Sequence, residues 1–153
     1  MQRFHAEAYA KFAPQVRPLP GATDLLRHLA KLGVPHAIAT SGRLESARVP
    51  LESLGVSPDL PVITRDQVRY AKPDPDLFLA AAERLGVSIH NSVVVGDSVW
   101  DLLAARRARA LGVGVLSGGY GQEELERAGA YRVYQDPGDL LAHLDEVGLR
   151  VPD

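Results

Sequence analysis

The sequence has 153 residues, of which 46% are hydrophobic and 24% charged, with a formal net charge of −2. These values are typical of a single globular domain, which at this length buries about two thirds of its surface without disulfides or structural metals. The absence of cysteine excludes disulfides, thiolate zinc sites and thiol catalysis, and the five histidines lie at no ligand-like spacing. The near-neutral charge argues against nucleic-acid binding, and no apolar run approaches the roughly 20 residues of a membrane span. We therefore expect a cytoplasmic protein that binds neither nucleic acid nor membrane.

Helices and strands alternate along the chain, as the spacing of apolar residues indicates. The pattern predicts helices over residues 2–13, 21–32, 43–54, 75–85, 98–108, 122–128 and 137–146. It predicts strands over residues 34–39, 61–64, 92–95, 112–116 and 131–134. This alternation predicts an α/β fold, a Rossmann-like parallel sheet with helices on both faces. In such sheets ligands bind where the strands end, which selects three places in this sequence.

The first place follows the most hydrophobic short run of the chain, residues 92–95. Asp97 comes directly after this strand, and Asp101 lies four residues later, in the first turn of the next helix. Clustered carboxylates suit Mg²⁺, a hard cation that takes oxygen ligands. The alternative is structural: Asp97 or Ser98 caps the helix, and Asp101 complements its dipole.

The second place is the turn Thr40-Ser41-Gly42, where small hydroxylated residues end one strand and open a helix. A phosphate there would receive a hydroxyl hydrogen bond together with backbone N–H groups, whereas the alternative is a plain helix cap.

The third place is Lys72, one of only three lysines, which stands between a loop and a helix begun by a proline. This setting restricts its conformations and favours a fixed positive charge for a phosphate, although a solvated loop lysine is the alternative.

The chain order of hydroxyl, lysine and carboxylate pair resembles the haloacid dehalogenase-like (HAD) hydrolase superfamily, mostly Mg²⁺-dependent phosphatases. The resemblance runs from residue 19 to about residue 144 and includes LPG at 19–21, AKPDP at 71–75 and VLSGGYG at 115–121. These phrases are similar to the phosphoglycolate- and sugar-phosphatase branch, whose substrates are small phosphorylated metabolites. The resemblance implies catalytic roles for Thr40 and Lys72, and it implies that Asp97 binds Mg²⁺ with Asp101 as its outer-sphere or orienting partner. The phosphate ligands that it implies are Thr40, Ser41, Gly42 and Lys72.

One departure from the family concerns its two catalytic aspartates, which follow the first strand in a phrase like Asp-x-Asp-Gly-Thr. No Asp-x-Asp-Gly occurs here, and the single Asp-x-Asp, at residues 74–76, follows no apolar strand. Residues 1–17 resemble the last helix of the family's cap, and residues 18–153 resemble the core. The resemblance thus implies that the first strand and most of the cap are missing, and that the chain as given is an inactive phosphatase.

The missing strand lies, in the family's sheet, between the strand that ends at Thr40 and the one that ends at Gly96. Because each buried unpaired backbone group costs about 1–3 kcal/mol, we expect these strands to pair with each other, to pair with a partner, or to come from a chain that was once longer. Self-association into a homo-oligomer through the strand edges is one such arrangement.

Two other functions are open to this sequence. A HAD scaffold without the catalytic aspartates would serve as a non-catalytic phosphate-binding or interaction module. A receiver domain of two-component signalling also combines Asp, Thr and Lys on a parallel sheet, but there the acidic residues precede the hydroxyl and the lysine. Here Thr40 and Lys72 come first, which argues against a receiver domain.

Overall fold

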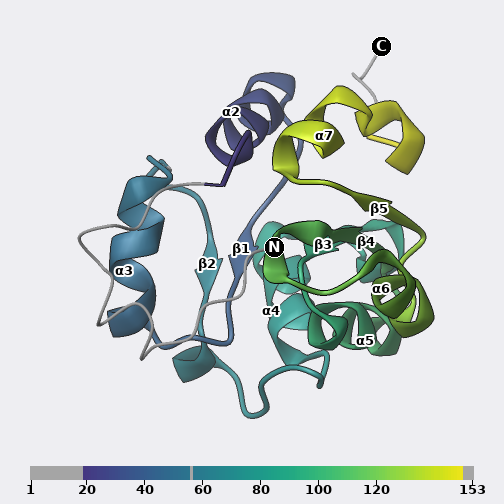
Figure 1. Cartoon of the computed structure of the whole chain (residues 1–153). Coiled ribbons are helices and arrows are strands. Elements are labelled where there is room, and N and C mark those ends of the chain that lie inside the picture. Colours follow the sequence, from purple (N-terminus) through teal and green to yellow (C-terminus); the bar gives the residue numbers. More distant parts are fainter. Residues whose placement is uncertain (1–18, 56, 150–153) are drawn as a thin grey trace.

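The computed structural model describes residues 19–55 and 57–149, whose elements alternate between helix and strand as predicted (Figure 1). The helices are α2 (Ala22–Leu32), α3 (Leu44–Ser53), α4 (Asp76–Leu85), α5 (Val99–Ala108), α6 (Gln122–Ala128) and α7 (Pro137–Ala142). The strands are β1 (Ile38–Ala39), β2 (Val62–Ile63), β3 (Val93–Gly96), β4 (Leu111–Val115) and β5 (Arg132–Tyr134). Short 3₁₀ helices are η2 (Arg65–Gln67), η3 (Ile89–Asn91), η4 (Leu116–Gly118) and η5 (Leu144–Val147). The predicted helix 2–13 and the division at residue 17 lie outside the described residues, so the predicted domain boundary stays a prediction.

The described strands form two parallel sheets instead of one continuous sheet. β1 pairs with β2, placing Ile38 opposite Val62, and β4 lies between β3 and β5, with Val94 opposite Gly112. Figure 1 shows the two sheets side by side, with β1 and β3 at their facing edges. Direct pairing of these two strands, one of the arrangements expected from the sequence, does not occur.

Helices cover both faces of the larger sheet, which confirms the predicted architecture. On one face, α2 and α7 contribute Leu25 and Leu140 to a buried cluster with Val113 of β4. On the other face, Leu102 of α5 packs with Leu125 of α6. Among the described helices, none is long and apolar enough to cross a membrane.

Helix α4 joins the two sheets. Its buried side chains Leu77 and Phe78 belong to one cluster with Ala39 of β1, Ile63 of β2 and Val94 of β3. Because this cluster touches both sheets, it fixes their position relative to each other.

Two elements are each four residues shorter than predicted. The expected strand 34–39 is reduced to Ile38–Ala39; Pro35, within the lost part, has no backbone N–H to donate to a ladder. The expected helix 137–146 ends at Ala142, because His143 leaves the helical conformation. The ring Nδ1 of His143 lies 2.8 Å from the Asp139 carbonyl oxygen, which would otherwise accept the His143 backbone N–H. That N–H bonds to Leu140 O instead.

Candidate phosphate and metal site

The carboxyl ends of β1 and β3 meet at Lys72. Its Nζ lies 3.3 Å from the carbonyl oxygen of Ala39, the last residue of β1, and 2.7 Å from Asp101 Oδ1, one turn after β3. Both strands therefore end at the same edge of the fold. Since Thr40 follows β1 and Asp97 follows β3, the structure brings the three predicted places together.

Lys72 is not a solvated loop residue, so that alternative is wrong. The side chains of Lys72 and Asp101 are both fully buried. The Lys72 ammonium also lies 5.1 Å from the centre of the Phe78 ring, within range of a cation–π contact. These contacts hold one positive charge in a fixed position beside the ends of both strands.

Asp101 organises the turn between β3 and α5. Its Oδ2 accepts hydrogen bonds from the backbone N–H groups of Asp97 (3.1 Å) and Ser98 (3.3 Å). The Ser98 hydroxyl donates to the same oxygen, and Ser98 Oγ accepts the Asp101 N–H, which completes a capping box. The alternative role predicted for these residues is therefore confirmed for two of them: Ser98 caps α5, and Asp101 lies in its first turn. Oδ1 of Asp101 contacts Lys72, and Oδ2 accepts three hydrogen bonds from the turn. Asp101 therefore fixes the positions of Lys72 and of the turn after β3.

Gly96 is required for this arrangement. A Cβ on Gly96 would lie 2.3 Å from the Cβ of Asp101, which is far closer than van der Waals contact. The glycine lets the fully buried carboxylate fold back against the end of β3.

Asp97 is a buried carboxylate in surroundings that disfavour its charge. Burial, and after it the negative charge of Asp101, raise the pKa of Asp97 from 3.8 to about 6. Gly118, in η4, packs against it so closely that a Cβ there would lie 2.3 Å from Asp97 O. A bound cation would offset the unfavourable charge.

The donor set fits Mg²⁺ with one direct protein carboxylate. Within residues 19–55 and 57–149, no group of three or more His, Cys, Asp or Glu side chains is placed to hold a metal ion. Mg²⁺ is commonly bound through one or two carboxylates, with waters and substrate phosphate as its other ligands. Asp97 would supply that carboxylate, and Asp101 would orient it.

The turn after β1 presents hydroxyl groups at the same edge. Thr40 is fully buried, and its Oγ1 accepts the N–H of Gly42 at 3.0 Å. Ser41 Oγ is enclosed and has no hydrogen-bond partner within the described part of the chain. Leaving a buried hydroxyl without a hydrogen bond lowers the stability of the fold, and an anion bound at this turn would accept that hydrogen bond.

Sequence reasoning missed the residue that holds this turn in place. Asp66, in η2, accepts hydrogen bonds from the Arg43 guanidinium (2.7 Å) and from the Leu44 N–H (2.9 Å). These two donors, the Leu44 N–H foremost, lower the pKa of Asp66 below its ordinary value. The neighbouring Arg65 N–H donates to Gly42 O at 3.0 Å. No local pattern reveals these contacts, because they join segments more than 20 residues apart in sequence.

Comparison with known proteins agrees with this geometry. A family model for haloacid dehalogenase-like hydrolases matches residues 2–109. Hexitol phosphatase A of Escherichia coli is 38% identical over 93 residues, which is 61% of this chain and 43% of that protein. A phosphoglycolate phosphatase of Caulobacter vibrioides is 34% identical over 144 residues, which is 94% of this chain and 57% of that protein. The chain thus spans about half the length of the curated relatives it matches.

Solved structures of similar proteins share the fold. A hydrolase from Pseudomonas syringae is 53% identical and superposes with a TM-score of 0.89, over 94% of this chain and 67% of that chain. A HAD family hydrolase from Deinococcus radiodurans, solved with bound phosphate and sodium, is 30% identical and superposes with a TM-score of 0.82, over 96% of this chain and 67% of that one. Together with the family match, these likenesses show that the chain belongs to the haloacid dehalogenase-like hydrolase family.

Proposed function

We propose that this chain is the phosphate- and Mg²⁺-binding part of a phosphomonoester phosphatase that acts on a small phosphorylated metabolite. The observation that carries the proposal is the buried Lys72 ammonium, which lies between the carboxyl ends of β1 and β3. The hydroxylated turn after β1 and the Asp97 carboxylate stand at the same edge. The names of the relatives, hexitol and phosphoglycolate phosphatases, support this reaction class.

Each group has a role that follows from its chemistry. The hydroxyls of Thr40 and Ser41 and the backbone N–H groups of the turn donate to phosphate oxygens, and Lys72 offsets their negative charge. Asp97 would hold Mg²⁺, and the bound ion would polarise the phosphoryl group. Asp101 keeps both Lys72 and the Asp97 backbone in place, so it is a positioning residue.

Three exposed apolar side chains that lie close in sequence to these groups favour an organic ester over a bare anion. Leu44, Tyr70 and Trp100 are 51%, 50% and 40% exposed, and each lies within four residues of a proposed site residue. Exposed aromatic and aliphatic side chains suit contact with the carbon skeleton of a substrate.

The chain as given should bind phosphate without turning over an ester, because no Asp-x-Asp-Gly phrase supplies the family's attacking carboxylate. The same absence favours the second candidate function, a non-catalytic phosphate-binding module on the HAD scaffold. The two candidates differ in whether hydrolysis appears once an upstream segment carrying that phrase is joined to the chain.

Hydrolysis of para-nitrophenyl phosphate in the presence of Mg²⁺ tests the proposal. We expect the 153-residue chain to match the buffer rate, and the extended chain to hydrolyse the ester in a manner that Asp97→Asn abolishes. An inactive extended chain that still binds phosphate would favour the module over the phosphatase. Turnover by the chain as given, abolished by Asp97→Asn, would show that another carboxylate attacks and would overturn the predicted inactivity.

A further inference from the structure

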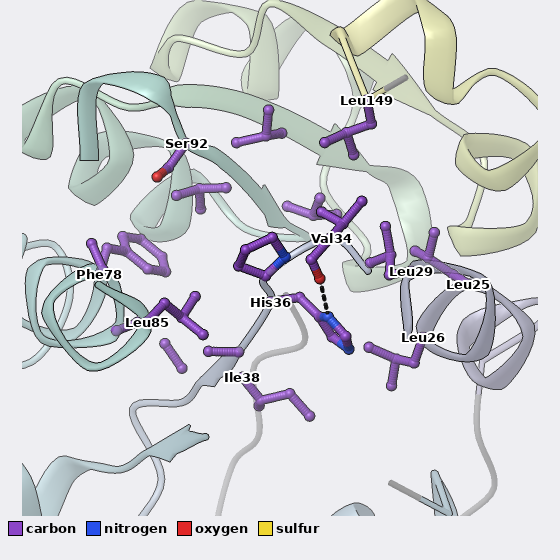
Figure 2. Close-up of a pocket in the computed structure, with 18 of the residues that line it drawn as sticks. Leu25, Leu26, Leu29, Val34, His36, Ile38, Phe78, Leu85, Ser92 and Leu149 are labelled. Atoms are coloured by element: carbon purple, nitrogen blue, oxygen red, sulfur yellow. Dashed lines mark hydrogen bonds between the residues drawn. The ribbon is translucent and has the colours of Figure 1, made fainter. Parts of the chain in front are cut away.

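The turn after β1, residues 40–42, is held from the side of β2. On the other side of β1, toward β3, lies an apolar cavity of about 330 Å³ (Figure 2). Ile38 and Ala39 of β1 line this cavity, whereas no residue of the turn, which the structure describes in full, does so. The backbone of the turn is bonded instead to the segment that follows β2.

Backbone hydrogen bonds fix both ends of this turn. The N–H of Thr40 donates to Ile63 O at 2.9 Å, and the N–H of Arg65 donates to Gly42 O at 3.0 Å. Neither bond uses Ser41, the residue between Thr40 and Gly42. The Ser41 hydroxyl is enclosed and has no partner within the described part of the chain, so a turn fixed at both ends presents a free donor.

Asp66 supplies the cap that α3 lacks. Arg43, the residue before α3, provides no side-chain cap of its own. The Asp66 carboxylate accepts the N–H of Leu44, the first residue of α3, at 2.9 Å from Oδ2. Asp66 stands in η2, where Gln67 Oε1 accepts the Thr64 N–H at 2.8 Å and closes the turn that positions the carboxylate. The start of α3, which directly follows the turn after β1, is therefore anchored to η2.

The bond to Leu44 is more important than the ion pair between Asp66 and Arg43. Arg43 Nη1 lies 2.7 Å from Asp66 Oδ1, but the two side chains are 67% and 41% exposed, and exposed ion pairs contribute little to stability. Replacing a side chain that caps a helix with alanine changes an equilibrium constant by about fivefold. We therefore expect the main effect of removing the Asp66 carboxylate to be the release of the start of α3.

We infer that Asp66 is a positioning residue for phosphate, which acts by holding the turn after β1 so that Ser41 donates to the anion. The inference rests on the proposed function, because it requires phosphate to bind at this turn. Asp66 carries a negative charge and contacts Leu44, two residues beyond the turn. Electrostatics alone would make the removal of this charge strengthen anion binding, whereas loss of a positioned turn weakens it. The sign of the effect therefore distinguishes the two.

Titration of the chain with inorganic phosphate at constant Mg²⁺, followed by nuclear magnetic resonance, tests the inference. We expect Asp66→Ala to weaken phosphate binding by about fivefold. Asp66→Asn should bind phosphate at least as tightly as the wild-type chain, because its amide oxygen still accepts the Leu44 N–H and the negative charge is gone. The matched control is Asp139→Ala in α7. Asp139 Oδ2 accepts the Gln135 N–H at 2.9 Å, so this variant removes the same kind of bond elsewhere and should leave phosphate binding unchanged.

A double substitution shows whether Asp66 acts through Ser41. Ser41→Ala removes the hydroxyl that the turn presents, so in that background we expect Asp66→Ala to weaken phosphate binding by about twofold or less. The free energies of unfolding in urea should show no such coupling, because the Ser41 hydroxyl has no partner among the described residues. A purely structural role of Asp66 would instead weaken phosphate binding by the same factor in both backgrounds.

Hydrogen exchange adds a measurement on the wild-type chain that needs no variant to fold. Because coupling is reciprocal, a bond that favours phosphate binding is itself strengthened by bound phosphate. We expect saturating phosphate to slow exchange of the Leu44 amide, which donates to Asp66, by about fivefold. Exchange of the Gln135 amide, which donates to Asp139, should stay unchanged.

The possible outcomes separate this inference from the proposed function. Unchanged or tighter phosphate binding by a folded Asp66→Ala variant would overturn the inference and leave the phosphate site in place. Equal losses in the wild-type and Ser41→Ala backgrounds, or equal slowing of the Leu44 and Gln135 amides, would show that Asp66 does not position Ser41. Absence of phosphate binding by the wild-type chain would overturn the proposed function and this inference together.

Discussion

The Nζ atom of Lys72 lies 2.7 Å from Asp101 Oδ1, and both side chains are fully buried. Removing one partner of a buried ion pair leaves the other charge uncompensated, at a cost of about 3–5 kcal/mol. We therefore expect Asp101→Asn to lower the free energy of unfolding in urea by that amount. The control is Asp24→Asn, which removes an exposed partner of Arg27 and should change stability by less than about 1 kcal/mol. Similar effects of the two substitutions would contradict a buried, unscreened pair.

The raised pKa of Asp97 gives stability a defined pH dependence. Because the pKa is 3.8 ordinarily and about 6 in the fold, the folded state binds the proton more tightly. The stability contributed by this proton is present below pH 4 and is lost as pH rises through 6. Without Mg²⁺, we expect Asp97→Asn to be more stable than the wild-type chain at pH 7, with a difference that shrinks toward pH 4. A less stable Asn variant at pH 7 in thermal unfolding would refute this assignment.

Gly118 sets the position of Asp97, because a Cβ there would meet the Asp97 backbone and carboxylate. We expect Gly118→Ala to displace Asp97 and to weaken Mg²⁺ binding by about tenfold, measured by isothermal titration calorimetry. Gly121→Ala is the matched control, since the nearest contact of a Cβ there is Glu124 Oε1 at 3.4 Å. If both variants bind Mg²⁺ like the wild-type chain, then the packing of η4 does not position the ligand.

Ser41 offers a test that separates binding from stability. Its hydroxyl is enclosed and has no partner among the residues the structure describes, so Ser41→Ala should leave the free energy of unfolding unchanged or higher. If this hydroxyl donates to phosphate, the same substitution lowers the affinity for inorganic phosphate by roughly fivefold to tenfold. Lower stability together with unchanged phosphate affinity would identify the hydroxyl as structural.

The sequence predicted most elements because their signals are local. Apolar spacing located the described α-helices and strands, and the rule for parallel sheets selected the strand ends that carry Thr40 and Asp97. Lys72 lies beyond η2, in the loop that leads into α4. The split into two sheets was harder to predict from the sequence. A single sheet forms only if β1 and β3 pair with each other or with a third strand between them. The pairing of Lys72 with Asp101 joins residues that no periodicity relates.

The same limit explains the details that differ. The early end of α7 depends on the His143 side-chain conformation, in which ring Nδ1 contacts the Asp139 carbonyl oxygen that would otherwise accept a helical hydrogen bond. Asp66 supports the turn after β1 across more than 20 residues of sequence, and it lies in a segment predicted as plain connection. Side-chain contacts between distant segments are set by the packed fold, so composition and spacing do not reveal them.

The most direct test of the proposed site is a nuclear magnetic resonance titration of the isotope-labelled chain with inorganic phosphate in the presence of Mg²⁺. We predict saturable shifts largest at the backbone amides of Ser41, Gly42, Lys72 and Asp97. We also predict that these shifts weaken when Mg²⁺ is omitted. Shifts confined to the exposed arginines Arg106 and Arg107, or no shifts at all, would contradict a phosphate site at the carboxyl ends of β1 and β3.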